Sequence, residues 1–243
     1  MSGEVKKVHR LFILIGVFAI AMGFLEAIVV VYLREIFYPQ GFDFPLTILS
    51  PSMYSIELLR EATTLVMLAI VGIIAGKNKL QKFSYFIYCF GVWDIFYYVG
   101  LKILIDWPSF LLTWDVLFLI PVPWVGPVLA PVICSLTMIF LAMCIVYPQE
   151  IGYEVSLTYR EWSLISVGAL IIFYSFIQDY TNIIVEGGFL ENIWTLRKNE
   201  NFNQIISEFI PTCYNWIMFA AGEILILLSI VLILVNVKSQ KQF

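Results

Sequence analysis

Ionisable side chains interrupt the apolar segments of this chain, and they are the residues best suited to do chemistry. Within the segments lie Glu26, Glu57, Arg60, Glu61, Asp94, Asp179 and Glu223, and at segment edges lie Lys102 and Asp115. An ionised carboxylate at the centre of a bilayer costs about 2.5–3.5 kcal/mol on insertion scales. We therefore expect these groups to be paired, protonated or hydrated, as in proton relays, ion sites and substrate sites.

Helical spacing gathers most of these side chains on three faces. A polar stripe recurs at i, i+3, i+4, i+7 and i+11, formed by Ser175, Gln178, Asp179, Asn182 and Glu186. A second face repeats every four residues, with Asp94, Tyr98 and Lys102. The third face comprises Glu57, Glu61 and Thr64, with Arg60 beside it and within reach of either carboxylate. We expect all three faces to turn towards protein and away from lipid.

Small residues accompany the two remaining acids. Ala19, Gly23 and Ala27 repeat every four residues, a pattern typical of closely packed membrane helices. Glu26 follows Gly23 by three residues, so it is predicted to face a neighbouring helix. Glu223 follows a run of three small residues, which predicts an equally close-packed setting.

Composition identifies the lipid bilayer as the solvent of these helices. Of the 243 residues, 61% are hydrophobic and 13% are charged, whereas soluble domains carry about 25% charged residues. The mean hydropathy is +0.90. A water-soluble enzyme is thereby excluded. Nucleic acid is excluded as a partner, because the net charge is −4 and the basic residues are scattered.

Six segments are long enough to cross about 30 Å of hydrocarbon, which takes about 20 residues in a helix. They are residues 11–33, 56–76, 83–105, 116–147, 162–185 and 214–237. Backbone amides in lipid must be satisfied within the segment, which favours helices. The predicted fold is an all-α, polytopic bundle of six transmembrane helices, forming a single integral membrane domain over residues 1–243.

The fourth segment is too long for a simple span and contains four prolines. Pro121, Pro123, Pro127 and Pro131 surround Gly126, and each proline removes a backbone donor. A broken or re-entrant stretch is predicted at residues 116–127. Two interpretations remain open: such backbone lines a functional cavity, or the prolines only kink a helix that is packed for shape.

Apolar residues between the fifth and sixth segments recur at the spacing of an amphipathic helix. They are Phe202, Ile205, Ile206, Phe209 and Ile210, and Phe189, Leu190, Ile193 and Trp194 suggest a second such helix. We expect these outer helices to lie in the membrane interface. They either seal the bundle or act as a lid over a pocket.

Basic residues predict the orientation in the membrane. Nine would share one side: Lys6, Lys7, Arg10, Lys77, Lys79, Lys82, Arg160, Lys238 and Lys241. The positive-inside rule then places both termini in the cytoplasm. A plasma membrane is the favoured location. In this orientation most of the intramembrane acids fall in the outer half of the membrane.

Histidine and cysteine usage limits the cofactors. The only histidine, His9, lies in a basic stretch before the first apolar segment, and the four cysteines form no CxxC pair. Haem and histidine-ligated metals are therefore not expected, and no cofactor is predicted. A divalent cation held by oxygen alone, at Glu57 and Glu61, is the metal site left open.

Two Trp-Asp pairs, at 93–94 and 114–115, leave two interpretations open. Either Trp114 belongs with Trp107 and Trp124 to an interfacial aromatic belt, or Asp94 and Asp115 face one cavity, each backed by an indole. The surplus of acids would attract protons, cations or a cationic headgroup. Three functions fit: a proton- or cation-coupled transporter, an accessory or structural subunit of a membrane complex, and an intramembrane enzyme acting on a lipid or lipid-linked substrate. The expected partners are membrane lipid, a small cation or proton, and a partner membrane subunit.

Overall fold

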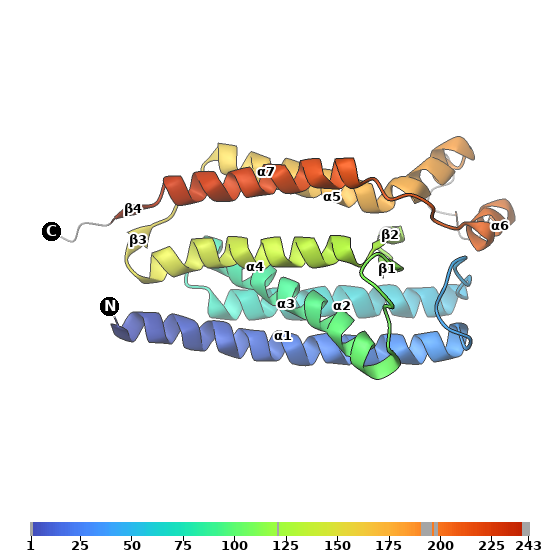
Figure 1. Ribbon diagram of the computed structural model, residues 1–243, viewed down its shortest axis with the longest axis horizontal. Coiled ribbons are helices and arrows are strands. Elements are labelled where there is room, and N and C mark those ends of the chain that lie inside the picture. The colour runs from blue at the N-terminus through green and yellow to red at the C-terminus, as the bar shows by residue number, and fades with distance from the viewer. Residues whose placement is uncertain (1, 121, 191–195, 197–198, 240–243) are drawn as a thin grey trace.

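The computed structural model describes residues 2–120, 122–190, 196 and 199–239, and it is a helical bundle (Figure 1). Six of the described helices are long and apolar enough to cross a membrane: α1 (Ser2–Phe37), α2 (Pro51–Ala75), α3 (Lys79–Ile105), α4 (Leu129–Glu150), α5 (Tyr159–Glu186) and α7 (Trp216–Val235). The predicted all-α fold with six spans is confirmed, and the chain is a multi-pass integral membrane protein.

The predicted fourth span, 116–147, is wrong at its start. Residues 114–127 form an antiparallel hairpin of β1 (Trp114–Phe118) and β2 (Trp124–Pro127), and α4 begins only at Leu129. Asp115 pairs with Gly126 in this hairpin, and the register shifts between Val116 and Phe118. The prolines prevent a continuous helix, and the facing backbone groups of the two strands pair with each other instead.

Side chains cap the helices where the sequence supplies short polar residues. The Ser50 side chain accepts from the Met53 amide at the start of α2, and Asn78 caps α3 through the Gln81 amide. Thr158 and Glu161 form a capping box at the start of α5. These caps satisfy amides that a helix leaves free at its first turn.

Glycines allow the closest helix contacts, as the small-residue stripe predicts. A Cβ atom on Gly23 would lie 2.7 Å from the carbonyl oxygen of Trp93, so α1 touches the backbone of α3. In the same pair of helices, a Cβ on Gly100 would lie 2.7 Å from the Cβ of Ala27. Gly168 and Gly222 allow the same approach between α5 and α7.

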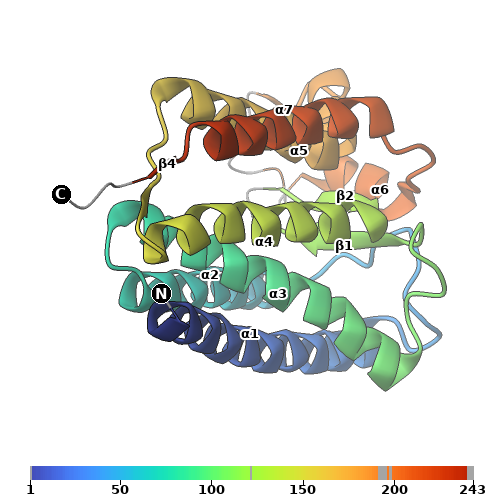
Figure 2. The same ribbon diagram turned by 60° about the vertical axis from the view of Figure 1, so that its left-hand side comes forward.

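The helices form two groups. In the first group α3 is central and packs against α1, α2 and α4, whereas the second group consists mainly of α5 packed on α7 (Figure 2). The main contacts between the groups join α4 to α7, β2 to α5, and β3 (Tyr153–Glu154) to β4 (Lys238–Ser239). The two groups are therefore packed less extensively against each other than the helices are within each group.

The two ends of the bundle differ. Both termini lie at one end, and the β1–β2 hairpin and α6 (Glu200–Glu208) lie at the other (Figures 1 and 2). The predicted amphipathic segment is thus helical up to Glu208, and its Phe202 is buried against Ile184 and Phe189. Of the second predicted amphipathic helix, Ile193 and Trp194 lie outside the described residues.

Gly23→Val tests the close contact between α1 and α3. The added side chain would meet the Trp93 carbonyl oxygen and the Phe96 backbone, so we expect the free energy of unfolding to fall by about 1–3 kcal/mol. Unfolding in mixed micelles by a denaturing detergent would measure it. Ala21→Val, on the exposed face of α1, is the matched control and should change little. Equal effects of the two substitutions would contradict this packing.

Candidate functional site

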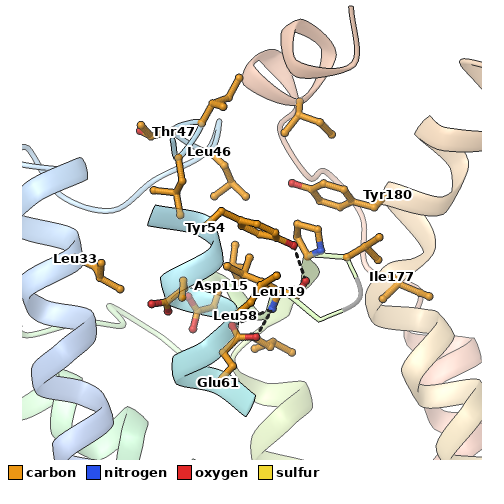
Figure 3. Close-up of a pocket in the computed structure, with 18 of the residues that line it drawn as sticks. Leu33, Leu46, Thr47, Tyr54, Leu58, Glu61, Asp115, Leu119, Ile177 and Tyr180 are labelled. Carbon is orange, nitrogen blue, oxygen red and sulfur yellow. Dashed lines mark hydrogen bonds between the residues drawn. The ribbon is translucent and has the colours of Figure 1, made fainter. Parts of the chain in front are cut away.

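A cavity of about 790 Å³ lies at the end of the bundle away from the termini (Figure 3). Its lining comes from α1, α2, α3 and the hairpin on one side, and from α5 and α6 on the other. Figure 3 shows Tyr54, Leu58 and Glu61 on α2 facing Ile177 and Tyr180 on α5. The cavity therefore lies at the boundary between the two helix groups.

Arg60 and the two acids that it contacts, Glu26 and Glu57, form what we call the charged floor of the cavity. The Nε and Nη2 atoms of Arg60 lie 2.9 and 2.5 Å from Oε1 of Glu57, one turn earlier on α2. Its Nη1 forms an ion pair with Glu26 of α1, and Thr64 donates to the same carboxylate at 3.4 Å. Glu26 thus faces a neighbouring helix, and one guanidinium compensates two buried acids from two helices.

A second ion pair joins α1 to the hairpin. Nη2 of Arg34 lies 3.1 Å from Oδ1 of Asp115, and both side chains are buried. The guanidinium carbon also lies 4.4 and 3.8 Å from the ring centres of Phe42 and Trp107, within cation–π range. Burial raises the pKa of Asp115 to about 6, although the charge of Arg34 opposes this rise.

Arg34 was not among the sequence-predicted site residues, because it lies near the end of its apolar segment. The signal that could have identified it is spacing: Arg34 follows Glu26 by eight residues, which places both on one face of a helix. A tertiary contact with a hairpin that the sequence did not predict supplies its partner.

Asp94 of α3 reaches the same cavity. Ser135 of α4 donates to its Oδ2 at 2.8 Å, while its Oδ1 accepts no hydrogen bond from the described residues. Asp94 and Asp115 both line the cavity, as the two Trp-Asp pairs suggested. Trp93 lines it as well, but Trp114 packs against Tyr214 instead.

Glu61 and Tyr54 hold the tip of the hairpin against α2. Both carboxylate oxygens of Glu61 accept from the Leu119 amide at 3.0 Å, and the Tyr54 hydroxyl donates to the Leu119 carbonyl at 3.0 Å (Figure 3). Together with Arg34 and Asp115 at its base, these contacts attach the hairpin to the first helix group. Its β2 strand packs on α5 of the second group.

The polar stripe of α5 does not reach this cavity. Gln178 and Asp179 line a separate pocket of about 340 Å³, where Asn215 donates to Gln178 at 3.1 Å. Asn182 is exposed. The α5 residues that line the main cavity, such as Ile177 and Tyr180, belong to another face of the helix.

Glu223 and Lys102 also lie apart from the cavity lining. Glu223 of α7 accepts from Thr137 of α4 at 2.9 Å, at the boundary between the helix groups. Lys102 turns outward, where it pairs with Asp106 at 2.7 Å and donates to the Pro108 carbonyl. Of the predicted face formed by Asp94, Tyr98 and Lys102, the first two line the cavity and Lys102 does not.

The geometry adds no support for an oxygen-ligated metal. Among the described residues, no three of His, Cys, Asp and Glu are arranged to hold a metal ion. Arg60 engages Glu57, and the Leu119 amide engages both oxygens of Glu61. The divalent site at Glu57 and Glu61 stays a prediction.

The chain matches no family model, no curated protein and no solved structure. The function must therefore be inferred from the cavity itself. Its described lining contains five acids, two arginines and otherwise mostly apolar side chains. Two of the acids, Asp94 and Glu61, form no salt bridge with the described residues, so they are the groups best placed to exchange protons or bind a cation.

Arg60→Met tests the charge compensation in the floor. Removing the guanidinium leaves Glu26 and Glu57 buried without a cation, and we expect a loss of about 3–5 kcal/mol in the free energy of unfolding. The triple variant with Glu26→Gln and Glu57→Gln should recover most of it. Lys102→Met, in an exposed pair, is the control and should change little. A mild effect of Arg60→Met alone would contradict the proposed compensation.

Glu61→Leu tests the attachment of the hairpin. The Leu119 amide would lose its acceptor, which is worth about 1–3 kcal/mol for a buried group, so its hydrogen exchange should accelerate at least about tenfold. Mass spectrometry of peptides covering residues 116–124 would measure this. Thr63→Val, on the exposed face of α2, should leave the exchange unchanged, and an unchanged rate in Glu61→Leu would refute the attachment.

Proposed function

We propose that this integral membrane protein is a proton-coupled carrier and that the 790 Å³ cavity is its substrate site. The observation that carries the proposal is the position of Asp94 and Glu61. Both carboxyl groups line a cavity between two helix groups, and neither forms a salt bridge with the described residues.

The surroundings of Asp94 support a role in proton coupling. A carboxyl group away from water and without a cation favours its neutral form, and an arriving cation reverses that preference. Ionisable groups that interact electrostatically with Asp94 include Asp115 on the hairpin, Tyr97 and Tyr98 on α3, and Cys134 on α4. None of these four groups is a cation, and the two arginines of the lining, Arg34 and Arg60, are paired with other acids. We therefore expect protonation of Asp94 to depend on what occupies the cavity.

The two-group architecture supports alternating access. Carriers commonly rock one helix group against another around a site between them. Here the cavity takes its lining from both groups, and the main contacts between them run through α4 with α7 and β2 with α5. If the two groups moved relative to each other, the shape of the cavity and its opening would change. The packing of α1 on α3 and of α5 on α7 would be kept.

The orientation of the protein in the membrane determines which side the cavity faces. The cavity lies at the end opposite to the termini, and the basic residues favour cytoplasmic termini. We therefore propose a plasma-membrane location with the cavity in the outer half of the membrane. The exposed apolar side chains of the six long helices would contact membrane lipid.

Uptake into proteoliposomes tests the carrier. A panel of labelled organic cations, anions and zwitterions would be offered to vesicles with an imposed pH gradient of either sign. We expect the gradient to drive accumulation of at least one class severalfold above protein-free vesicles. Asp94→Asn should abolish this accumulation, because it removes the proton-exchanging group without changing its size.

Asp106→Asn is the matched control, since Asp106 is exposed and its salt bridge, among the residues that the structure describes, is with Lys102. It should transport as well as the unaltered protein. Uptake equal to that of protein-free vesicles for every class would contradict a carrier and favour an accessory subunit. Uptake that ignores the pH gradient, or that survives Asp94→Asn, would contradict proton coupling.

A further inference from the structure

We infer that the cavity binds a lipophilic organic cation, which means a positively charged centre carried on an apolar body. The inference names the substrate class of the carrier proposed above and rests on that function for transport, whereas the binding itself rests on the cavity. Three features support it: the excess of acids over arginines in the lining, the ion pairs that already engage both arginines, and the apolar and aromatic walls.

The charge balance favours a cation. Five acids and two arginines make up the charged residues of the described lining. Asp94 is 9% exposed, lines the cavity and keeps its Oδ1 without a hydrogen bond from the described residues. Only Oε1 of Glu57 is engaged by Arg60. The floor can therefore offer carboxylate oxygens to a positive group.

The two arginines are already neutralised, which disfavours an anion. Arg60 lies between Glu57 and Glu26, and Arg34 is paired with Asp115 while its guanidinium stacks near two aromatic rings. Arg34 keeps one donor, Nη1, without a hydrogen-bond partner among the described residues, but an anion bound there would lie beside Asp115 and face the surplus of acids in the lining. Breaking either ion pair to free a guanidinium would leave an uncompensated buried acid. No other described residue of the lining carries a positive charge.

The walls select an organic cation over a hydrated inorganic ion. The lining includes Leu33, Leu46, Leu58 and Ile177 (Figure 3), whose side chains cannot replace the water shell of an inorganic ion. The cavity volume of about 790 Å³ falls within the roughly 300–1,000 Å³ of small-molecule sites. One compact organic molecule would fill it.

Aromatic rings strengthen the argument. Tyr54 on α2 and Tyr180 on α5 lie on either side of the space in Figure 3, and Tyr97 lines the cavity near Asp94. Aromatic faces attract organic cations, and quaternary ammonium groups are commonly held this way. Since Tyr54 and Tyr180 belong to different helix groups, a bound cation would contact both groups at once.

Two probes of the same shape and opposite charge test the inference. Binding of tetraphenylphosphonium and tetraphenylborate would be measured by equilibrium dialysis to the full chain in lipid nanodiscs, with protein-free nanodiscs subtracted. We expect saturable phosphonium binding at least tenfold tighter than borate binding. It should weaken at least tenfold in Asp94→Asn and when the pH falls from 8 to 5, because protonation removes the negative charge. Asp106→Asn should bind normally.

A second variant guards against misfolding. Ile177→Trp would narrow the cavity while leaving every acid in place, and it should also weaken phosphonium binding. Thermal unfolding without probe would establish that each variant is folded. Three results would overturn the inference: no saturable phosphonium binding, borate binding as tight as phosphonium binding, or unchanged binding in folded Asp94→Asn and Ile177→Trp.

The same measurements separate this inference from the carrier. Phosphonium binding without gradient-driven uptake would support the cation site and contradict the carrier. Gradient-driven uptake of an organic anion that phosphonium does not inhibit would support the carrier and overturn the cation site.

Discussion

Compensation of buried charge is the constraint on which the rest of this structure depends. The interior of a membrane bundle solvates charge poorly, so an ionised group buried there needs a partner held at short range. Arg60 meets this need for Glu57 on its own helix and for Glu26 on α1. Since α1 and α2 each pack mainly against α3, this guanidinium joins them directly across the cavity floor. The position of one side chain thus sets the relation between two helices.

The hairpin extends the same principle from side chains to backbone. A proline-rich segment cannot satisfy its amides as a helix, so it needs acceptors from elsewhere. Each strand supplies acceptors to the facing amides of the other, and Glu61 supplies another at Leu119. Arg34 compensates Asp115 at the other end of β1. The hairpin is thereby tied to the first helix group while its second strand packs on α5, which makes it a structural link between the groups.

Sequence periodicity predicts the membrane spans and the inward-facing sides of the helices well. Both depend on the residues of a single helix and on whether lipid or protein surrounds it. The stripe of Ala19, Gly23 and Ala27 correctly predicted a close helix contact, and Glu26 faces a neighbouring helix. Periodicity cannot say which helix lies opposite a face. Asp179 turned to a different pocket for this reason, and Glu223 turned to α4.

Two other features escaped the sequence for different physical reasons. The prolines at 121–131 exclude a continuous helix but do not distinguish a kink from a hairpin, because strand pairing is decided by a partner segment. Lys102 has the spacing of a buried residue, yet it lies near the end of α3, where a long side chain reaches outward to Asp106 and the Pro108 carbonyl.

The charged floor also affects how closely α1 and α2 approach beside the cavity. Apolar helices with small residues approach until their backbones touch, as α1 and α3 do at Gly23. Arg60 and Glu26 prevent this between α1 and α2, since two long polar side chains and their partners must fit between the helices. The cavity itself lies between this pair of helices and α5 of the other group. The residues that charge its lining therefore also set the spacing of the two helices on its first side, so charge and shape are linked there.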